Sequence, residues 1–245
     1  MVLSVSRLSK AYGGVQAVRD VSFSVAPGEI VAIIGPNGAG KTTCFNMLNG
    51  QLVPDAGEIR LGEASLVGLP PHRVSRLGVG RTFQVTATFG SMSVRENVQT
   101  ALRSHQRKNY SMWRNAGRFF SQEAQALLER VGMRDQAERP CAVLAYGDLK
   151  RVELAIALAS RPGLLLMDEP TAGMAPQERG ALMALAAGLA QRERLAVLFT
   201  EHDMEVVFGF ASRIIVMHLG EVIAAGSPEE VRADARVREV YLGDA

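Results

Sequence analysis

One glycine-rich segment constrains the fold of this chain more than any other feature. It matches the pattern G-x-x-x-x-G-K-[ST] in full and consists of Gly35, Pro36, Asn37, Gly38, Ala39, Gly40, Lys41 and Thr42. The apolar, β-branched run from Glu29 to Ile34 predicts a buried strand just before it. The residues from Lys41 to Asn49 predict a helix just after it, closed by Gly50. A strand, a glycine loop and a helix in this order indicate an α/β fold that binds phosphate.

The chemistry of phosphate binding explains this spacing. Glycines allow backbone N–H groups to approach phosphate oxygens without a Cβ in the way, and the following helix presents its positive end. The Lys41 ammonium is expected to reach the β- and γ-phosphates, and the Thr42 hydroxyl to ligate Mg²⁺. A dinucleotide fold is disfavoured because Thr43 stands where a third glycine is needed. The segment therefore predicts a site for ATP and Mg²⁺.

Acidic and imidazole side chains follow two further apolar runs. Leu164 to Met167 leads directly into Asp168 and Glu169, and Leu195 to Phe199 leads into Thr200-Glu201-His202. Because parallel sheets bind ligands at the carboxyl ends of their strands, these side chains are expected beside the glycine loop. Asp168 is then placed to hold Mg²⁺, Glu169 to deprotonate the attacking water, and His202 to meet the γ-phosphate.

The remaining pattern predicts one α/β domain over residues 1–245 with a mostly parallel sheet. Helical periodicity dominates from Val94 to Ser160, which predicts a helical insertion at about residues 90–160. A further helix is expected at Gln177 to Arg192. Additional strands are expected at Val21 to Val25, Glu58 to Leu61, Arg213 to Val216 and Glu221 to Ala224.

Composition excludes several other classes of protein. Of the 245 residues, 47% are apolar and 21% charged, and the net charge of +2 gives no field directed at nucleic acid. Bases and aromatics interleave between Arg103 and Phe119, but a solvated helical face is favoured over a nucleic-acid site. No apolar run is long enough to cross a membrane. Cys44 and Cys141 form no motif and are expected to be buried, reduced thiols in the cytoplasm.

Taken together, these residues resemble the ATP-binding-cassette (ABC) family along nearly the whole chain. Gln84, in Arg-Thr-Phe-Gln, looks like the Q-loop glutamine, which in the family contacts Mg²⁺ and senses the membrane partner. Gly35 to Thr43 resembles the Walker A segment, so the resemblance implies that Thr43 also binds the nucleotide. Tyr12 resembles the aromatic residue that stacks on adenine, residues 172–176 the D-loop, and His202 the switch histidine. The resemblance implies a mostly parallel core, an antiparallel β subdomain and an inserted helical subdomain.

The signature motif of the family is altered in this chain. The segment that resembles it consists of Leu144, Ala145, Tyr146, Gly147 and Asp148, where the common form is Leu-Ser-Gly-Gly-Gln. The serine hydroxyl that would contact the γ-phosphate is absent. Backbone N–H groups and the dipole of the following helix are expected to carry more of that contact.

Four short segments resemble one subgroup, the ATPases of branched-chain amino acid importers. They are Leu-Ala-Tyr-Gly, Arg-Thr-Phe-Gln, Glu-His-Asp-Met from Glu201, and the terminal Tyr-Leu-Gly from Tyr241. Other transport systems remain open, such as lipopolysaccharide export or urea and amide uptake, as does an ABC protein without a transport role. A small-molecule P-loop kinase would not explain Gln84, Asp168-Glu169 and His202 at once.

The resemblance also implies partners and a place in the cell. Two such subunits sandwich two ATP molecules in the family, so a homodimer or heterodimer is expected, with a lean towards the heterodimer. Two permease subunits, and indirectly a solute-binding protein, would complete the importer at the cytoplasmic face of the inner or plasma membrane. No nucleic-acid partner is expected. Val85 to Phe89 could line a groove for a permease helix or simply be buried, and the sequence leaves both open.

Overall fold

The computed structural model describes residues 1–82, 88–105 and 120–242. Its larger sheet has six strands in the order β10-β9-β3-β8-β7-β6. They are β3 (Ile30–Ile34), β6 (Val79–Thr82), β7 (Leu164–Asp168), β8 (Ala196–Thr200), β9 (Arg213–His218) and β10 (Glu221–Gly226). All neighbours pair in parallel except β9 and β10, which confirms the predicted mostly parallel core.

The smaller sheet is antiparallel and has the order β2-β1-β4-β5. Its strands are β1 (Leu3–Tyr12), β2 (Val15–Val25), β4 (Ala56–Leu61) and β5 (Ala64–Ser65). The expected strands at Val21 to Val25 and Glu58 to Leu61 are parts of β2 and β4. Strand β1 was not predicted, because polar residues interrupt its alternation and the register with β2 shifts three times.

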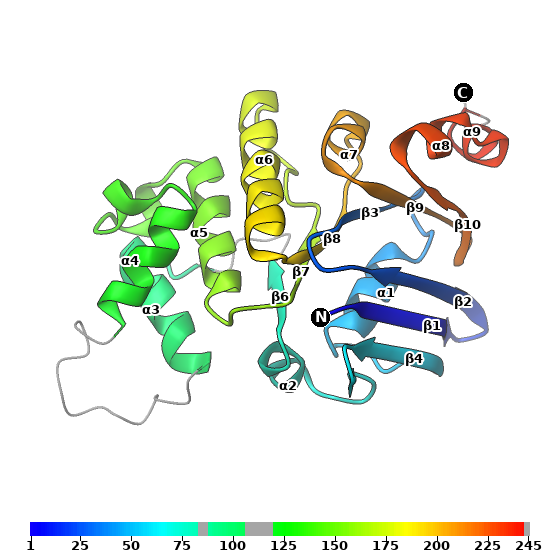
Figure 1. The fold of residues 1–245 in the computed structure, drawn as a ribbon, viewed down its shortest axis with the longest axis horizontal. Helices are drawn as coiled ribbons and strands as arrows, with labels where there is room; N and C mark the ends of the chain where they lie inside the picture. The colour runs from blue at the N-terminus through cyan, green and yellow to red at the C-terminus, as the bar shows by residue number, and fades with distance from the viewer. Residues whose placement is uncertain (83–87, 106–119, 243–245) are drawn as a thin grey trace.

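The helices lie in separate groups (Figure 1). Helices α3 (Val94–His105), α4 (Ser121–Arg130) and α5 (Tyr146–Leu158) form the helical region, interrupted by 3₁₀ turns at Arg134–Gln136 and Cys141–Val143. The long α6 (Pro176–Glu193) and the shorter α7 (Met204–Phe210) follow β7 and β8. The remaining helices are α1 (Lys41–Leu48), α2 (Pro71–Arg76), α8 (Pro228–Ala233) and α9 (Ala235–Leu242).

The six-stranded sheet separates two apolar cores. Along β3, Ile30, Ala32 and Ile34 pack with the helical region and α6, whereas Val31 and Ile33 pack with α1 and the antiparallel sheet. Every residue of β3, β7 and β8 is buried, so the three strands that lead to the predicted site residues are held from both faces. That rigidity fixes the edge of the sheet where those residues lie.

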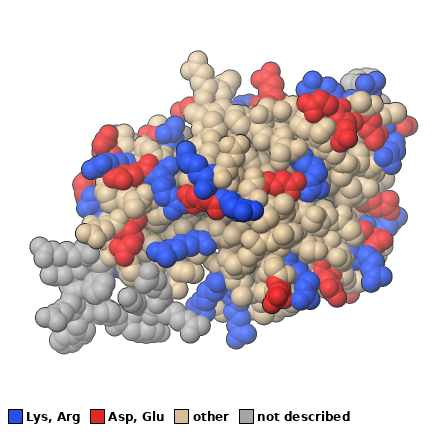
Figure 2. All heavy atoms as spheres, viewed as in Figure 1, with Lys and Arg blue, Asp and Glu red and all other residues tan. Residues whose placement is uncertain are grey.

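Charge on the surface is mixed. On the face drawn in Figure 2, Lys and Arg side chains alternate with Asp and Glu among the residues described. No helix within residues 1–82, 88–105 and 120–242 combines the length and the apolar character needed to cross a membrane.

Candidate functional site

The glycine loop between β3 and α1 is packed so tightly that two of its glycines are required. A Cβ at Gly35 would lie 2.1 Å from the carbonyl oxygen of Met217, and one at Gly40 would lie 2.2 Å from that of Ala17. Both positions, and Gly38, have positive φ. A Cβ at Gly38 would meet nothing within 4 Å, so this side of the loop is open to a ligand.

Lys41 begins α1 and turns back over the loop. Its Nζ donates to the carbonyl oxygens of Gly35 at 2.6 Å and Pro36 at 3.1 Å. Burial lowers the pKa of Lys41, and the charges of Glu169 and Asp168 oppose the shift. Both carboxylates therefore act on the loop lysine, as expected if the loop and the acidic pair share one ligand.

Asp168 lies at the carboxyl end of β7 with both of its oxygens bonded. The hydroxyl of Thr200 donates to Oδ1 at 2.8 Å, and Nη2 of Arg81 donates to Oδ2 at 3.1 Å. The register of β7 with β8 places Asp168 opposite Thr200. Neither partner was assigned a role from the sequence, although Thr200 ends an apolar strand just as Asp168 does.

Glu169 and His202 contact each other, as their positions at neighbouring strand ends predict. Nε2 of His202 is 3.0 Å from Oε1 of Glu169. Glu169 has a left-handed backbone, with φ of 46°. Its N–H is shared between the carbonyl and hydroxyl oxygens of Thr200, both at 3.1 Å. This strained turn directs the carboxylate out of the strand towards the loop after β8.

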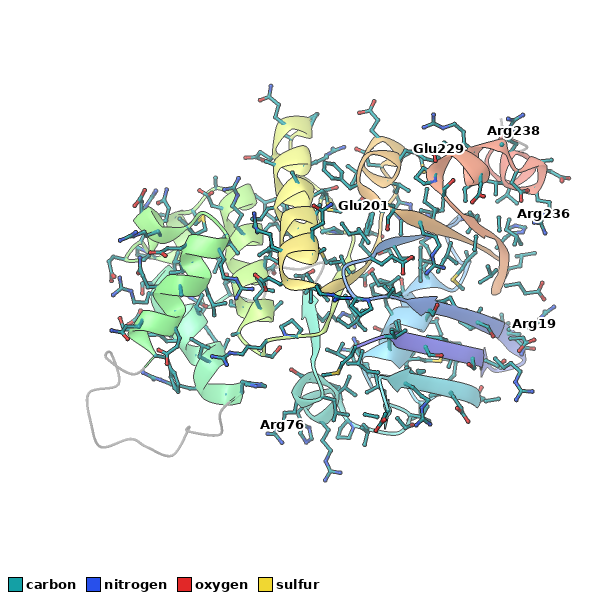
Figure 3. The ribbon with its side chains drawn as sticks, viewed as in Figure 1. Arg19, Arg76, Glu201, Glu229, Arg236 and Arg238 are labelled. Carbon is teal, nitrogen blue, oxygen red and sulfur yellow. The ribbon has the colours of Figure 1, made fainter. Side chains whose placement is uncertain are left out.

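Glu201 is a buried carboxylate to which the sequence assigned no role. Its Oε1 accepts from the N–H of Thr171 at 2.8 Å and from the hydroxyl of Thr171 at 2.6 Å. Figure 3 shows Glu201 in the interior, between α6 and α7. These bonds join the segment after Glu169 to the segment that carries His202, so Glu201 holds the two catalytic candidates in one geometry.

The D-loop is tied to the same region by Arg179. Nε of Arg179 donates to the carbonyl oxygen of Met174 at 2.8 Å, and Nη1 donates to Oδ2 of Asp203 at 2.5 Å. Asp203 in turn caps α7 by accepting from two backbone N–H groups. The hydrogen bond from Arg179 lowers the pKa of Asp203.

The signature segment ends in the first turns of α5. Its helix is capped at Ala145 without a side-chain hydrogen bond, which agrees with the expectation that backbone groups are presented there. A Cβ at Gly147 would lie 3.1 Å from the Glu178 carboxyl group, and one at Gly173 would lie 3.6 Å from the Tyr146 ring. The signature segment and the D-loop of one chain are therefore neighbours.

Of the remaining residues predicted from the sequence, Tyr12 is described and Gln84 is not. Tyr12 ends β1 with 46% of its surface exposed, and Nζ of Lys10 lies 5.9 Å from its ring centroid. Gln84 lies outside the described residues, as do Val85 to Ala87 and residues 106–119 of the basic and aromatic segment. Phe89, the last residue of the groove hypothesis, is 58% exposed.

The residues at this sheet edge fit a nucleotide with Mg²⁺. The glycine loop has the close backbone packing and the open side that a phosphate needs, and Lys41 supplies positive charge. The Thr42 hydroxyl, on the first turn of α1, and the Asp168 carboxylate are hard oxygen donors, which suit Mg²⁺. Among the described residues no three His, Cys, Asp or Glu side chains form a metal cluster. Mg²⁺ ordinarily takes one or two carboxylates and completes its shell with water and phosphate oxygens.

Comparisons with known proteins identify the family. The family model described as "ABC transporter" matches residues 18–172, and "Branched-chain amino acid ATP-binding cassette transporter" matches residues 221–245. The chain is 40% identical to LivG of Salmonella typhimurium, a high-affinity branched-chain amino acid transport ATP-binding protein, covering 100% of this chain and 98% of LivG. It is 39% identical to BraF of Pseudomonas aeruginosa, which carries the same description, with the same coverage of both chains.

Solved structures give the same fold. The ADP conformation of MJ1267, an ATP-binding cassette of an ABC transporter, superposes with a TM-score of 0.87 at 29% identity, covering 99% of this chain and 98% of MJ1267. The dimeric cassette MJ0796 bound to ADP and Pi superposes with a TM-score of 0.77 at 25% identity, covering 92% of this chain and 98% of MJ0796. With a matching model over more than half of its residues and full-length relatives, this chain belongs to the ABC transporter family, as an ATP-binding cassette that hydrolyses ATP.

Proposed function

We propose that this chain is the ATPase subunit of an importer for branched-chain or other hydrophobic amino acids. The observation that carries the substrate class is the C-terminal match to the branched-chain amino acid family over residues 221–245. The full-length likeness to LivG and BraF supports it. Lipopolysaccharide export is disfavoured, although LptB of Acidithiobacillus ferridurans is 36% identical over 99% of this chain and 97% of its own.

The proposed hydrolysis uses the residues gathered at the sheet edge. Lys41 and the loop N–H groups hold the β- and γ-phosphates, while Thr42 and Asp168, with Gln84, hold Mg²⁺. When bound, Mg²⁺ neutralises charge that develops on the transferred phosphoryl group. Glu169 takes a proton from the attacking water, and His202, 3.0 Å from it, orients that carboxylate and faces the γ-phosphate.

The proposed working unit is a dimer in which each site is completed by the second subunit. The signature residues 144–148 lie at the start of α5, in the helical group, apart from α1 (Figure 1). In this proposal they cover the γ-phosphate held by the loop of the other subunit, and Tyr12 stacks on adenine. ATP adds contacts to both faces and closes the dimer, and hydrolysis removes them, which makes a two-state switch.

The proposed membrane partners are two permease subunits, with this chain peripheral on the cytoplasmic side. A cavity of about 330 Å³ lies between α2 and β6 on one side and α3 and α5 on the other. Its walls combine apolar residues with Arg76, Arg81, His72 and His105, which suits a permease helix that is apolar on one face. Cross-links from Ser104→Cys to a co-expressed permease should form, and cross-links restricted to other surfaces would contradict this docking site.

The variant Glu169→Gln tests the assignment of the base. The amide keeps the shape but cannot accept the proton, so phosphate release should fall by about 100-fold or more. ATP binding should persist, and ATP should drive dimerisation measurable by size-exclusion chromatography. Phosphate release near the unmutated rate would eliminate Glu169 as the base.

Substrate class is tested by reconstitution with the permease and binding protein. Leucine, isoleucine or valine with its binding protein should stimulate ATP hydrolysis and be taken up, whereas a charged amino acid should not. Stimulation by lipopolysaccharide or urea alone would overturn the substrate proposal and leave the ATPase assignment intact.

A further inference from the structure

Arg81 joins three elements through a single guanidinium group. It stands on β6, and its side chain is 12% exposed. Nη1 donates to Oδ1 of Asn46 on α1 at 3.0 Å and to Oε1 of Gln51 beyond α1 at 2.9 Å. Nη2 donates to Oδ2 of Asp168 at 3.1 Å. The helix that follows the phosphate loop is thereby tied to the acidic strand end.

Arg81 and Thr200 together hold the Asp168 carboxylate in one orientation. Thr200 occupies Oδ1 and Arg81 occupies Oδ2, so rotation of the carboxylate would break a bond on either side. The side chain of Asp168 is only 11% exposed, and a charge in such a site needs a partner. Each carboxylate oxygen has further acceptor capacity, so these bonds leave lone pairs for Mg²⁺ or for its water.

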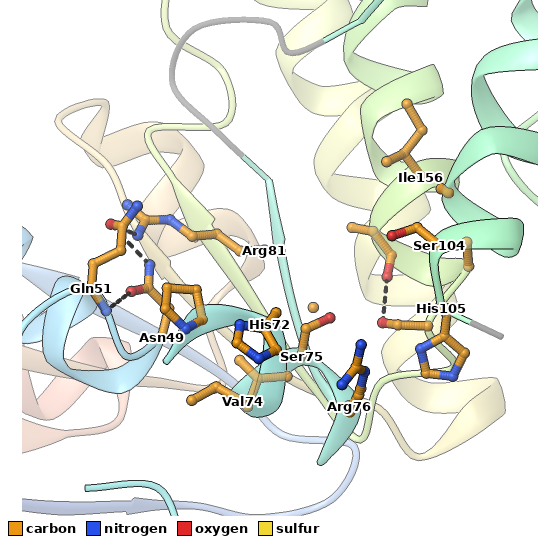
Figure 4. Close-up of a pocket in the computed structure, with 17 residues that line it drawn as sticks. Asn49, Gln51, His72, Val74, Ser75, Arg76, Arg81, Ser104, His105 and Ile156 are labelled. Carbon is orange, nitrogen blue, oxygen red and sulfur yellow. Dashed lines mark hydrogen bonds between the residues drawn. The ribbon is translucent and has the colours of Figure 1, made fainter. Parts of the chain in front are cut away.

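The same side chain forms part of the cavity between the core and the helical region. Figure 4 shows Arg81 bonded to Gln51 on one wall of this cavity, with Ile156, Ser104 and His105 on the other. Arg81 therefore contacts both the cavity and the Asp168 carboxylate. A movement of the cavity wall at Gln51 can therefore reach the Asp168 carboxylate through the side chains of Gln51 and Arg81.

Two opposing effects of Arg81 on a metal site must be weighed. Its positive charge repels Mg²⁺, while its hydrogen bond orients the ligand. Without Arg81, Oδ2 of Asp168 would lose the hydrogen bond from Nη2, while Thr200 would still bond Oδ1. A carboxylate held at one oxygen alone has more orientations open to it, and fewer of them suit a metal. Partners that orient a metal ligand typically contribute 10–100-fold to affinity or activity, so orientation should dominate.

We propose that Arg81 is a positioning residue that holds Asp168 for Mg²⁺ and connects it through Gln51 to the wall of the cavity between the core and the helical region. This inference rests on the proposed role of Asp168. The guanidinium fork is essential to it, because a lysine ammonium at the same position cannot reach Asn46, Gln51 and Asp168 with the same geometry.

The experiment compares Arg81→Lys and Arg81→Gln with the control Arg236→Gln, on α9, whose side chain pairs with Asp234 at the surface. Binding of trinitrophenyl-ATP is measured in EDTA and across a Mg²⁺ titration, together with phosphate release. Both Arg81 variants should need about 10-fold more Mg²⁺ than the unmutated protein to reach half of their maximal phosphate release. In EDTA, their Kd for trinitrophenyl-ATP should stay within about two-fold of the unmutated value. Arg236→Gln should leave both values unchanged.

The possible outcomes separate this inference from the proposed function. An unchanged Mg²⁺ requirement in Arg81→Lys and Arg81→Gln would overturn the positioning role. A lowered requirement would also overturn it, because it would show that charge repulsion between Arg81 and Mg²⁺ dominates. If Arg81→Gln does not fold, Arg81→Lys, which keeps the charge, decides the question. Failure of the unmutated protein to bind or hydrolyse ATP with Mg²⁺ would instead refute the proposed function itself.

Discussion

Removing the hydroxyl of Thr200 should destabilise the protein by about 1.5 kcal/mol. Thr200 is 1% exposed, and its hydroxyl donates to Oδ1 of Asp168 at 2.8 Å. Thr200→Val keeps the shape but removes a hydrogen bond to a charged group, which costs about 1.5–3 kcal/mol. The added methyl group returns about 0.8 kcal/mol. The N–H of Glu169 also loses the Thr200 hydroxyl, but it remains bonded to the Thr200 carbonyl. This second loss therefore adds little to the change in the free energy of unfolding.

The expected loss is large enough to measure by thermal unfolding. For a chain of this size, about 1.5 kcal/mol corresponds to a fall in Tm of about 3–6 °C. A double-mutant cycle with Asp168→Ala, followed by urea unfolding, isolates the bond from other effects of each change. The coupling free energy should be about 1.5–3 kcal/mol.

A second cycle serves as the control. Glu221 lies on β10, separated from β8 by β9 and β3, and bonds Arg19 instead. Thr200→Val and Glu221→Ala should therefore be additive within about 0.5 kcal/mol. If the Thr200–Asp168 coupling is no larger than this control, the reasoning that the hydroxyl supports the carboxylate is refuted.

Three further predictions follow from the loop, the thiols and the cap of α7. Gly40→Ala, whose Cβ would lie 2.2 Å from the Ala17 carbonyl at a φ of 99°, should abolish nucleotide retention and lower Tm; unchanged binding of trinitrophenyl-ATP would contradict it. Cys44 is fully buried and its pKa is raised to about 12, so iodoacetamide should label it only after denaturation, as mass spectrometry would show. Because the hydrogen bond from Arg179 lowers the folded pKa of Asp203, its contribution is present above the unfolded pKa of about 3.9 and is lost as the pH falls through the lower folded pKa. Unfolding scans at pH 7 and pH 3 should show Asp203→Asn lowering Tm more at pH 7, and an equal loss at both would argue against it.

The structure and comparisons confirm the predicted fold class and family. The short, fully buried strands were recognisable because apolar runs bounded by Gly, Asp-Glu or Thr-Glu-His have few alternative structures. The helix expected to reach Asn49 ends at Leu48, and the strand expected from Leu195 runs from Ala196 to Thr200. The single-domain boundary and the roles of the site residues stay predictions.

The short strand β6 shows why part of the site was missed. Its four residues include a glycine and an arginine, and so few residues show no alternation that could be recognised. Its position is set by parallel pairing with β7, more than eighty residues further along the chain. That pairing brings Arg81 to Asp168, and no local pattern around Arg81 indicates its partner.

The sequence by itself determined the phosphate loop, the strand ends that carry Asp168 and His202, and the family, because each is encoded in a short run with a fixed backbone geometry. Only the tertiary structure decided which side chains meet at those strand ends. Strand order and register brought Thr200 and Arg81 onto the two oxygens of Asp168, and the left-handed turn at Glu169 directed its carboxylate to His202. Such contacts depend on pairing between distant segments, which the chain acquires only when the sheet forms.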